Sequence, residues 1–378
     1  PDDIKTINDL SKLPILTKEE IRKNPEKFLA ENIKKISMIR SATSGSSGKV
    51  FEYMTDKRVL SISRALGLRA WGFAGYNIGD RLVTIAGSSL LPQKRSFLEN
   101  ITFKANRNLP LSSYNMDNKK VINYVHQILK FKPNFIRGYP SSIAIIANYL
   151  IEHNIQDIKP VAVMTTAETL YKRDRELISN AFDCDVFDQC GCNDGGENFW
   201  ECKEHTGYHI GVERAIHEFV DNANEQVSND IGHIILTDLW NYAMPLIRYD
   251  AGDIAIASDE MCPCGRGLPL VKTIMGRTID QIVLPSGDLL PGLIFTDIFE
   301  REGITDKVID YQIIQDKIDK FTLNIVKNEG YNDKTSVAIY KFFDGHMDTS
   351  LDIKFNFADN IPRTDANKKR IVISKVRK

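Results

Sequence analysis

The chain has 378 residues, of which 42% are hydrophobic and 26% are charged. This composition is typical of a globular protein, and the length suits one large domain with a smaller one. Its 49 basic and 50 acidic residues give a formal net charge of −1, so no overall field favours a nucleic-acid backbone or an anionic membrane. No apolar run reaches the roughly 18 residues that a membrane-spanning helix needs. The six cysteines do not form a disulfide framework in a chain this long, and the first residues are unlike a signal peptide; we therefore expect a cytoplasmic protein.

Helical patterning at 18–23 and 25–31 opens the chain and gives way to a loop rich in glycine and serine at 41–49. A helix is predicted at 55–73 after this loop, and a buried strand at 81–86. Helices and strands then alternate to about residue 200, with helices at 121–129, 141–152 and 172–180 and strands at 135–138, 161–165 and 186–189. Such alternation is typical of parallel sheets with helical crossovers.

From 208 to 258 the pattern becomes that of short strands, predicted at 208–212, 216–220, 232–236 and 254–257. The tail has a mixed pattern, with strands near 310–326 and 351–357 and a helix near 334–343. We therefore predict an α/β protein. Its large N-terminal domain, 1–280, has parallel sheets and a β-rich subdomain at about 202–270; a small α+β domain, 281–378, follows.

The glycine- and serine-rich loop concentrates backbone N–H groups, hydroxyls and one ammonium. Its residues include Thr43, Ser44, Gly45, Ser46, Ser47, Gly48 and Lys49. Glycine lets the backbone curl closely around a ligand, and curled N–H groups form a cradle for an anion such as a triphosphate. The spacing differs from that of the common phosphate loop. The alternative is a flexible linker, but the threonine, the terminal lysine and the structured segments on both sides favour a phosphate grip.

Several segments, in the same order along the chain, resemble motifs of the AMP-forming acyl-CoA synthetase superfamily. They are Ser44–Lys49, Thr166-Ala-Glu168, Cys190–Asp194, Pro245–Asp253, Gly276–Asp280 and Ile361–Lys368. Met244–Tyr249 and Cys262-Pro-Cys-Gly-Arg266 resemble the phenylacetate–CoA ligase branch, which includes capsular-polysaccharide relatives and synthetases that adenylate a coenzyme. The resemblance covers essentially the whole chain.

The resemblance implies a two-step reaction and a role for each motif. A carboxylate attacks the α-phosphate of ATP, with Mg²⁺, and the acyl-adenylate then passes to a nucleophile such as CoA. The implied catalytic residues are Lys368, which bridges carboxylate and phosphate, and Asp194, which stands at the family's magnesium ligand. Nucleotide contacts fall on the loop 43–49 and on Ala167, Glu168, Asp188, Cys190, Gly191, Asn193, Asp253 and Arg277, the last two near the ribose. The small domain is implied to be a mobile lid, with its hinge at Asp280.

This sequence departs from the family pattern at three of these positions. Cys190 replaces an aromatic residue, so that adenine stacking would fall to another ring such as Phe187 or Phe199. Asp194 replaces a glutamate, for which Glu197 is a substitute candidate. Asn367 replaces a glycine, which leaves Lys369 as the alternative to Lys368 if the register slips.

Cys202, His205, Cys262 and Cys264 supply three thiolates and an imidazole, the donor set of a closed tetrahedral zinc site. His209 is an alternative fourth ligand. Some members of the resembled branch carry such a site, and its role would be structural. The simpler interpretation is that these are ordinary buried or free cysteines.

Three functions remain open at this point. The first is adenylation of an aryl or small acyl acid followed by thioester formation with CoA. The second transfers the acyl group to an amine, or AMP itself to a coenzyme. The third is a non-catalytic nucleotide-binding relative. The expected partners are a carboxylic acid and a thiol or amine acceptor, with no nucleic acid and no membrane span. A homodimer is one possible assembly.

Overall fold

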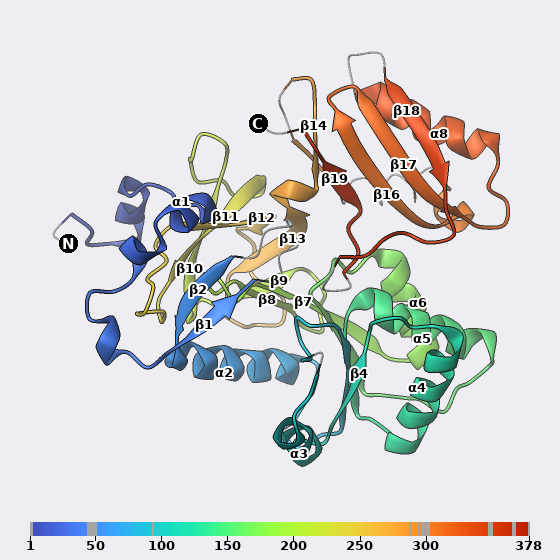
Figure 1. The fold of residues 1–378 in the computed structure, drawn as a ribbon, viewed down its shortest axis with the longest axis horizontal. Coiled ribbons are helices and arrows are strands. Elements are labelled where there is room, and N and C mark those ends of the chain that lie inside the picture. Colours follow the sequence, from blue (N-terminus) through green and yellow to red (C-terminus); the bar gives the residue numbers. More distant parts are fainter. Residues whose placement is uncertain are drawn as a thin grey trace. The chain divides into compact units, whose positions relative to one another are not determined.

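The computed structural model describes residues 3–43, 51–92, 94–286, 289–292, 295, 299, 303–346, 351–364 and 368–376. The chain divides into two compact units (Figure 1). Unit 1 comprises Pro1–Ala251 and Ala255–Ile274, and unit 2 comprises Gly252–Ile254 and Met275–Lys378. The boundary expected near Asp280 thus lies a few residues inside unit 2. An α/β protein with a small C-terminal α+β part is confirmed.

An eleven-stranded sheet forms the framework of unit 1, with strand order β10-β11-β12-β13-β9-β8-β7-β6-β5-β3-β4. Strands β3, β4, β5, β6 and β7 run parallel to one another. Their bounds are β3 Leu82–Ala86, β4 Asn108–Ser112, β5 Phe135–Gly138, β6 Ala162–Thr166 and β7 Asp185–Gly191. Strands β3, β5 and β6 are buried on both faces along most of their length, which is why they read as apolar runs without alternation.

The β-rich segment continues the same sheet. Strands β8 and β9 each pair antiparallel with the strand before them, and β10 pairs antiparallel with β11. The bounds are β8 Asn198–Glu201, β9 Tyr208–Ile210, β10 Ala215–Val220, β11 Ile231–Asp238, β12 Tyr249–Ser258 and β13 Leu270–Arg277.

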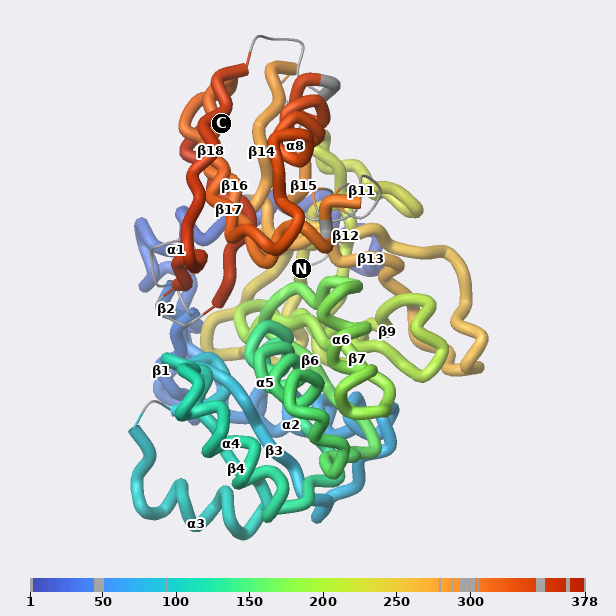
Figure 2. Tube along the Cα trace, turned by 90° about the vertical axis from the view of Figure 1, so that its right-hand side faces the viewer, coloured from blue at the N-terminus to red at the C-terminus, as the bar shows by residue number. Residues whose placement is uncertain are grey.

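Helices cover the parallel strands. Figure 2 shows α4, α5 and α6 side by side over β5, β6 and β7. The helices of unit 1 are α1 Lys18–Lys23, α2 Lys57–Phe73, α3 Phe97–Ala105, α4 Asn118–Phe131, α5 Pro140–Glu152 and α6 Lys172–Phe182. Apolar positions of α4, α5 and α6, among them Val125, Ile143 and Ile178, pack on one face of the parallel strands, where they share a core with Val163 of β6. This layer fixes the carboxyl ends of β5, β6 and β7, where ligands bind in sheets of this kind.

Unit 2 has a four-stranded sheet of order β18-β17-β16-β19 and a separate hairpin of β14 and β15. The bounds are β14 Gln281–Val283, β15 Leu289–Pro291, β16 Val308–Lys317, β17 Lys320–Lys327, α8 Asp333–His346, β18 Asp352–Phe357 and β19 Val372–Ser374. The buried Gln315 joins hairpin to sheet: its amide accepts the Val283 N–H (2.9 Å) and donates to the Val283 carbonyl (2.7 Å).

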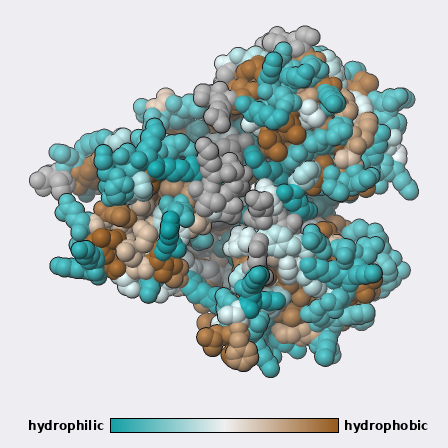
Figure 3. Space-filling view, in the orientation of Figure 1, coloured by the Kyte–Doolittle hydropathy of each residue, from teal (hydrophilic) through white to brown (hydrophobic). Residues whose placement is uncertain are grey.

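Apolar side chains are exposed on α3, where Phe97, Leu98 and Ile101 face solvent. Figure 3 shows apolar residues gathered at this lower end of unit 1. None of the helices in the described part of the chain is both long enough and apolar enough to cross a bilayer.

Candidate functional site

Thr43 closes the base of the glycine- and serine-rich loop. The strands on either side of the loop, β1 (Met38–Ala42) and β2 (Glu52–Asp56), pair antiparallel. The Thr43 N–H donates to the Phe51 carbonyl (2.9 Å), and the Phe51 N–H donates to Thr43 Oγ1 (3.2 Å). The loop is therefore the connection of a hairpin. Ser44, Gly45, Ser46, Ser47, Gly48 and Lys49 lie outside the described residues.

The turn after β6 has an unusual backbone. Ala167 has a φ of 70°, in the left-handed region that a residue with a Cβ seldom adopts. The next residue, Glu168, accepts the Ser141 N–H through Oε2 (3.3 Å), and so caps the first turn of α5. Ala167 also packs beside the fully buried Tyr139. Strained backbone of this kind is often found at ligand sites. The conformation of Ala167 is therefore compatible with the predicted adenine contact.

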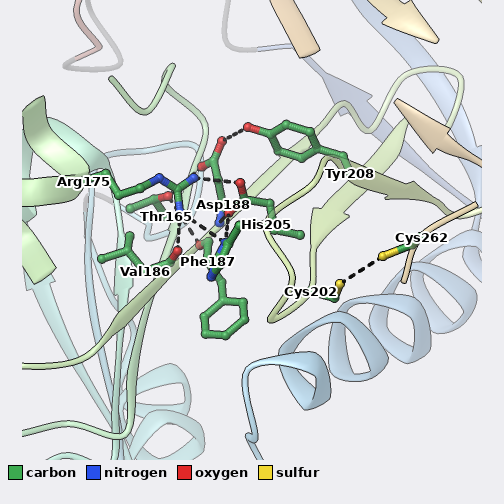
Figure 4. Close-up of polar contacts among 10 residues, drawn as sticks. Thr165, Arg175, Val186, Phe187, Asp188, Cys202, His205, Tyr208 and Cys262 are labelled. Carbon is green, nitrogen blue, oxygen red and sulfur yellow. Dashed lines mark hydrogen bonds and ion pairs between the residues drawn. The ribbon is translucent and has the colours of Figure 1, made fainter. Parts of the chain in front are cut away.

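Asp188 is buried on β7 beside this turn, with donors on both carboxylate oxygens (Figure 4). Thr165 Oγ1 donates to Oδ1 (2.6 Å), and the Tyr208 hydroxyl donates to Oδ2 (2.9 Å). Burial, followed by the nearby Glu201 carboxylate, raises the pKa of Asp188 to about 6. The carboxyl group therefore keeps its proton to a higher pH than an ordinary aspartate does.

Glu201 extends the network behind Asp188. Its Oε2 accepts the Asp188 N–H (2.7 Å), and its Oε1 accepts from Arg175 Nη2 (2.7 Å). His205 Nδ1 lies 3.3 Å from Oε2 of the same carboxylate, and its ring centroid lies 5.1 Å from that of Phe187. The residues of the whole network come from strands β6, β7, β8 and β9, helix α6 and the turn after β8, so the network fixes the end of β7.

Cys190 stands at the end of β7, partly buried, with Sγ 3.8 Å from Glu197 Oε1. The two rings considered as substitutes for stacking, Phe187 and Phe199, are both buried in cores. Gly191 is required here, because a Cβ would come within 2.6 Å of the Glu197 carbonyl oxygen. Asn193 is exposed.

Asp194 is buried and already paired. Lys18 Nζ lies 3.1 Å from Oδ2, and the Tyr249 hydroxyl donates to the same oxygen (2.8 Å). Lys18 also donates to the Ala251 carbonyl (2.8 Å). A Mg²⁺ ion at Oδ2 would have to displace an ammonium, so this arrangement does not fit direct ligation of magnesium by that oxygen.

Asp253 and Arg277, the pair predicted to contact ribose, lie together in unit 2, with Arg277 Nε 3.5 Å from Asp253 Oδ1. Asp280 is close to both. Burial raises the pKa of Asp280, and the Arg370 guanidinium opposes this shift by donating to Oδ1 from Nε (2.8 Å) and Nη2 (2.5 Å). The expected hinge residue thus forms an ion pair with Arg370, which lies just before β19.

Lys368 lies in a turn in which its N–H donates to Thr364 Oγ1 and its carbonyl accepts the Thr364 N–H, both at 3.0 Å. Lys369 points to a different place: its ammonium forms an ion pair with Asp310 and lies 5.6 Å from the Tyr311 ring centroid. Lys369 is held by Asp310, and the catalytic role of Lys368 stays a prediction.

The three cysteines of the predicted metal site come together with a histidine. The ligand atoms of Cys202, His209, Cys262 and Cys264 all lie within 4.8 Å of one another. Cys202 Sγ is 3.6 Å from Cys262 Sγ, and Cys264 Sγ is 3.4 Å from His209 Nε2. Thiolates about 2.3 Å from a tetrahedral zinc are separated by roughly 3.7 Å. The donors therefore fit a closed zinc site.

The histidine in this group is His209, the alternative, and not His205. His205 follows Cys202 in a turn whose geometry directs its ring to Glu201 and Phe187. His209 lies on β9, which pairs with β13 after the loop that carries Cys262 and Cys264. Burial lowers the pKa of His209, which favours the neutral imidazole that binds metals.

Sequence reasoning missed Lys18, Arg175, Glu201 and Tyr208 as partners of predicted site residues. Only tertiary contact identifies them, since nothing in their local patterns differs from a surface helix or a strand. Arg248, whose role the sequence left open, is structural: its guanidinium is buried against Glu218 (Nη2–Oε1 3.1 Å) and donates to the Leu13 carbonyl (2.6 Å).

Gly195 and Gly196 approach other parts of unit 1 closely. Both have positive φ, and a Cβ on Gly195 would lie 2.9 Å from side-chain atoms of Leu236 and Tyr249. A Cβ on Gly196 would lie 2.8 Å from Arg214. Packing against these side chains accounts for the glycine pair.

Comparison with known proteins finds similar chains. The family model described as the CapK C-terminal domain matches residues 285–375. Protein CapK of Staphylococcus aureus is 27% identical over 390 aligned residues, which cover 98% of this chain and 82% of that protein. A phenylacetate–coenzyme A ligase of Thermus thermophilus is 24% identical, over 83% of this chain and 70% of its own length.

Among solved structures, 2-hydroxyisobutyryl-CoA ligase in the postadenylation state, in complex with 2-HIB-AMP, superimposes with a TM-score of 0.73. The match covers 99% of this chain and 82% of the ligase at 17% identity. At this identity the likeness shows a shared fold.

Proposed function

We propose, from the premise that this chain belongs to the AMP-forming, adenylate-forming superfamily, that it activates a carboxylic acid with ATP and transfers the acyl group to CoA. Its relatives include phenylacetate–coenzyme A ligases. An aryl or small acyl acid is the substrate class that this kinship favours.

The observation that carries the proposal is the edge formed by the carboxyl ends of β6 and β7. Ala167 and Glu168 form a strained turn after β6, and Asp188 lies at the neighbouring position on β7, since Thr165 pairs with Asp188 in the register. Ligands of parallel sheets bind at such an edge. The turn and the carboxyl group supply the polar contacts that an adenine base needs.

In the proposed first step, an oxygen of the acid attacks the α-phosphorus of ATP. The bond between that phosphorus and the bridging oxygen breaks, and pyrophosphate leaves. In the second step the CoA sulfur attacks the acyl carbon, the thiol proton passes to solvent, and AMP leaves. Lys368 would stabilise the charge that develops on the phosphate oxygens in the first step.

Asp253, with Arg277 beside it, would orient the ribose. The magnesium that accompanies ATP would supply further neutralisation of phosphate charge. We do not assign Asp194 as its ligand, because Lys18 pairs with that carboxylate.

ATP–pyrophosphate exchange against a panel of carboxylic acids tests the first step, with Lys368→Ala compared against Lys369→Ala. We expect the first variant to lose about 10²-fold or more in exchange rate, as is usual when a group that stabilises developing charge is removed. The second variant should retain most of its rate, because Asp310 holds Lys369. Equal losses in both variants, or no exchange with any acid in the wild type, would argue against the proposal.

The acceptor is tested separately. The acid that supports exchange is incubated with ATP and either CoA or a set of amines, and the products are weighed by mass spectrometry. A CoA thioester supports the proposal. An amide, or an AMP adduct of a coenzyme, would move the protein to the second class of function.

We further propose that Cys202, His209, Cys262 and Cys264 hold a structural zinc ion. It would join the turn after β8 to the loop between β12 and β13. Zinc content, measured by mass spectrometry of the purified protein, should be about one ion per chain and should fall in Cys262→Ser but not in Cys184→Ser, since Cys184 lies outside the cluster. His209→Ala should lower zinc content more than His205→Ala; the reverse order would reinstate His205.

Rotation of the small domain between the two steps is also part of the proposal, with Asp280 as the hinge. Asp280→Pro should impair thioester formation more than pyrophosphate exchange, because a fixed φ would restrict the hinge. Equal impairment of both steps would contradict this assignment.

A further inference from the structure

Arg137 is the feature of unit 1 that neither the fold nor the proposed reaction explains. It lies on β5, paired with Thr84 of β3 and Met164 of β6. Its guanidinium carbon lies 4.9 Å from the centroid of the Trp71 ring, and Arg64 approaches the same ring, at 5.8 Å. Within the described part of the chain, Arg137 Nε is out of contact with solvent and has no acceptor.

The charges around Arg137 do not neutralise it. The groups that affect its pKa are the neighbouring Arg64, which lowers it, and the hydroxyl of Tyr139. Burial, with Arg64, lowers the pKa of Arg137 to about 10, so the guanidinium is still charged at neutral pH. Arg137 is half-buried, and its Nε is out of contact with solvent, so part of the guanidinium is desolvated with no counter-ion among the described residues. Desolvating a cation in this way is costly, and the Trp71 ring offsets only about 1 kcal/mol of that cost.

The surroundings of the guanidinium are aromatic. The ring of Trp71 meets Tyr76 edge-on (5.3 Å), and Tyr76 meets Phe135 in the same way (5.5 Å). These rings and Arg137 lie on the face of the sheet that carries Phe187 and Met164. The guanidinium thus lies beside apolar rings, a setting that suits an anionic group carried on an apolar body.

Arg137 is also close to the proposed nucleotide edge. Tyr139, two positions later at the carboxyl end of β5, packs beside Ala167, and its pKa responds to Glu168. The adjacent residues Gly138 and Thr165 pair across β5 and β6. Arg137 therefore lies on β5 one residue before Gly138, at the strand end that borders the proposed adenine turn.

We propose that Arg137, on the Trp71 face and with Arg64 beside it, binds a second carboxylate on the acid that the enzyme activates, so that the substrate is a dicarboxylic acid. The planar fork of arginine matches a carboxylate with two parallel hydrogen bonds. The carboxylate to be adenylated lies at the nucleotide, and the other one neutralises Arg137. This inference rests on the proposed function for the statement that the bound acid is adenylated. The anion site at Arg137 does not depend on it.

The kinetic test compares acids that differ only in the second carboxylate, such as butyrate with succinate and phenylacetate with its carboxymethyl derivative. Pyrophosphate exchange is measured for the wild type, for Arg137→Met and for the control Arg107→Gln, which removes an exposed guanidinium. In the wild type we expect a lower KM for each dicarboxylate than for its partner. Arg137→Met should raise the KM for the dicarboxylate by about 30-fold or more, as for other buried charge pairs, and leave the monocarboxylate unchanged.

A binding test keeps the site separate from catalysis. Succinate, or the phenyl diacid, is titrated without ATP and the shift in Tm is recorded for the same three proteins. A shift in the wild type and in Arg107→Gln that is absent in Arg137→Met supports the site, even if no acid supports exchange and the proposed function fails. No shift in any protein, an equal shift in Arg137→Met, or an equal KM for mono- and dicarboxylates overturns it.

Discussion

Two arginines in unit 1 meet the cost of burial in opposite ways. Arg248 is 3% exposed and has its donors filled by the chain: by Glu218 and by the carbonyls of Ser11 and Leu13. Arg137 faces a tryptophan ring and has no carboxylate partner among the described residues. The difference suggests a rule: a desolvated guanidinium is a cross-link where the fold supplies its acceptors, and, as proposed for Arg137, a binding group where the fold does not.

Removing the acceptor of Arg248 should have the largest effect. Glu218→Gln leaves the guanidinium buried against a neutral side chain, and breaking a buried pair costs about 3–5 kcal/mol. Unfolding in denaturant measures this loss, with the exposed Glu225→Gln as the matched control. A loss no greater than that of the control would remove the distinction between the two arginines.

Asp188 sharpens the comparison. Both of its carboxylate oxygens accept hydrogen bonds, and yet its negative charge is unfavourable in the folded protein. The folded-state pKa of Asp188 is about 6, above its ordinary value of 3.8. The folded state therefore holds the proton more tightly, so the free energy of unfolding should fall as the pH rises from 4 to 6. The full difference is on the order of 3 kcal/mol.

Asp188→Asn should abolish this part of the pH dependence. Unfolding in denaturant at intervals from pH 4 to pH 6.5 gives the difference between wild type and variant. That difference should shift in favour of the variant as the pH rises. A difference that is constant across the range would show that Asp188 keeps its ordinary pKa.

Lys18 and Asp194 form an intermediate case, in which a charge pair occupies a carboxylate expected to face a metal. Lys18→Met leaves Asp194 with the Tyr249 hydroxyl on the same oxygen, and the expected loss is about 2 kcal/mol of unfolding free energy. Lys23→Met, on the same helix and exposed, is the control. A double-mutant cycle with Asp194→Asn should show coupling; additive losses would mean that the pair is not formed.

Arg137→Met should have the smallest effect on stability. The change removes an unpaired cation and keeps an apolar body beside Trp71, so the free energy of unfolding should stay within about 1 kcal/mol of the wild type or increase. Thermal and denaturant unfolding both report it. A loss comparable with that of Glu218→Gln would show that Arg137 stabilises the fold like Arg248.

Local patterns predicted the elements well where the signal is local. The helix predicted at 172–180 is Lys172–Phe182, and the tail helix predicted near 334–343 is Asp333–His346. Thr55 and Asp56 were expected in a helix but belong to β2, because strand pairing with β1 overrides their propensity. The long sheet was not predicted, since strand order depends on contacts between distant segments.

The candidate site divides in the same way. Motif positions such as Asp253 and Arg277 were predicted together and lie together. The choice between His205 and His209 required the pairing of β9 with β13, and the partnership of Lys18 with Asp194 joins the first helix to a loop beyond β7. Arg137 looked like an ordinary strand residue, because nothing in a sequence marks the absence of a partner.

Unit 2 is built from two separate stretches of the chain, Gly252–Ile254 and Met275–Lys378. This division affects how the unit could be transferred from one protein to another. A gene segment that encodes only the region beyond residue 285, which the CapK C-terminal family model covers, would carry Lys368 into a new host. It would leave Asp253 and Arg277 behind, because both precede it in the chain. An inherited tail would thus bring the lysine proposed for catalysis but would depend on the recipient for the residues proposed to orient the sugar.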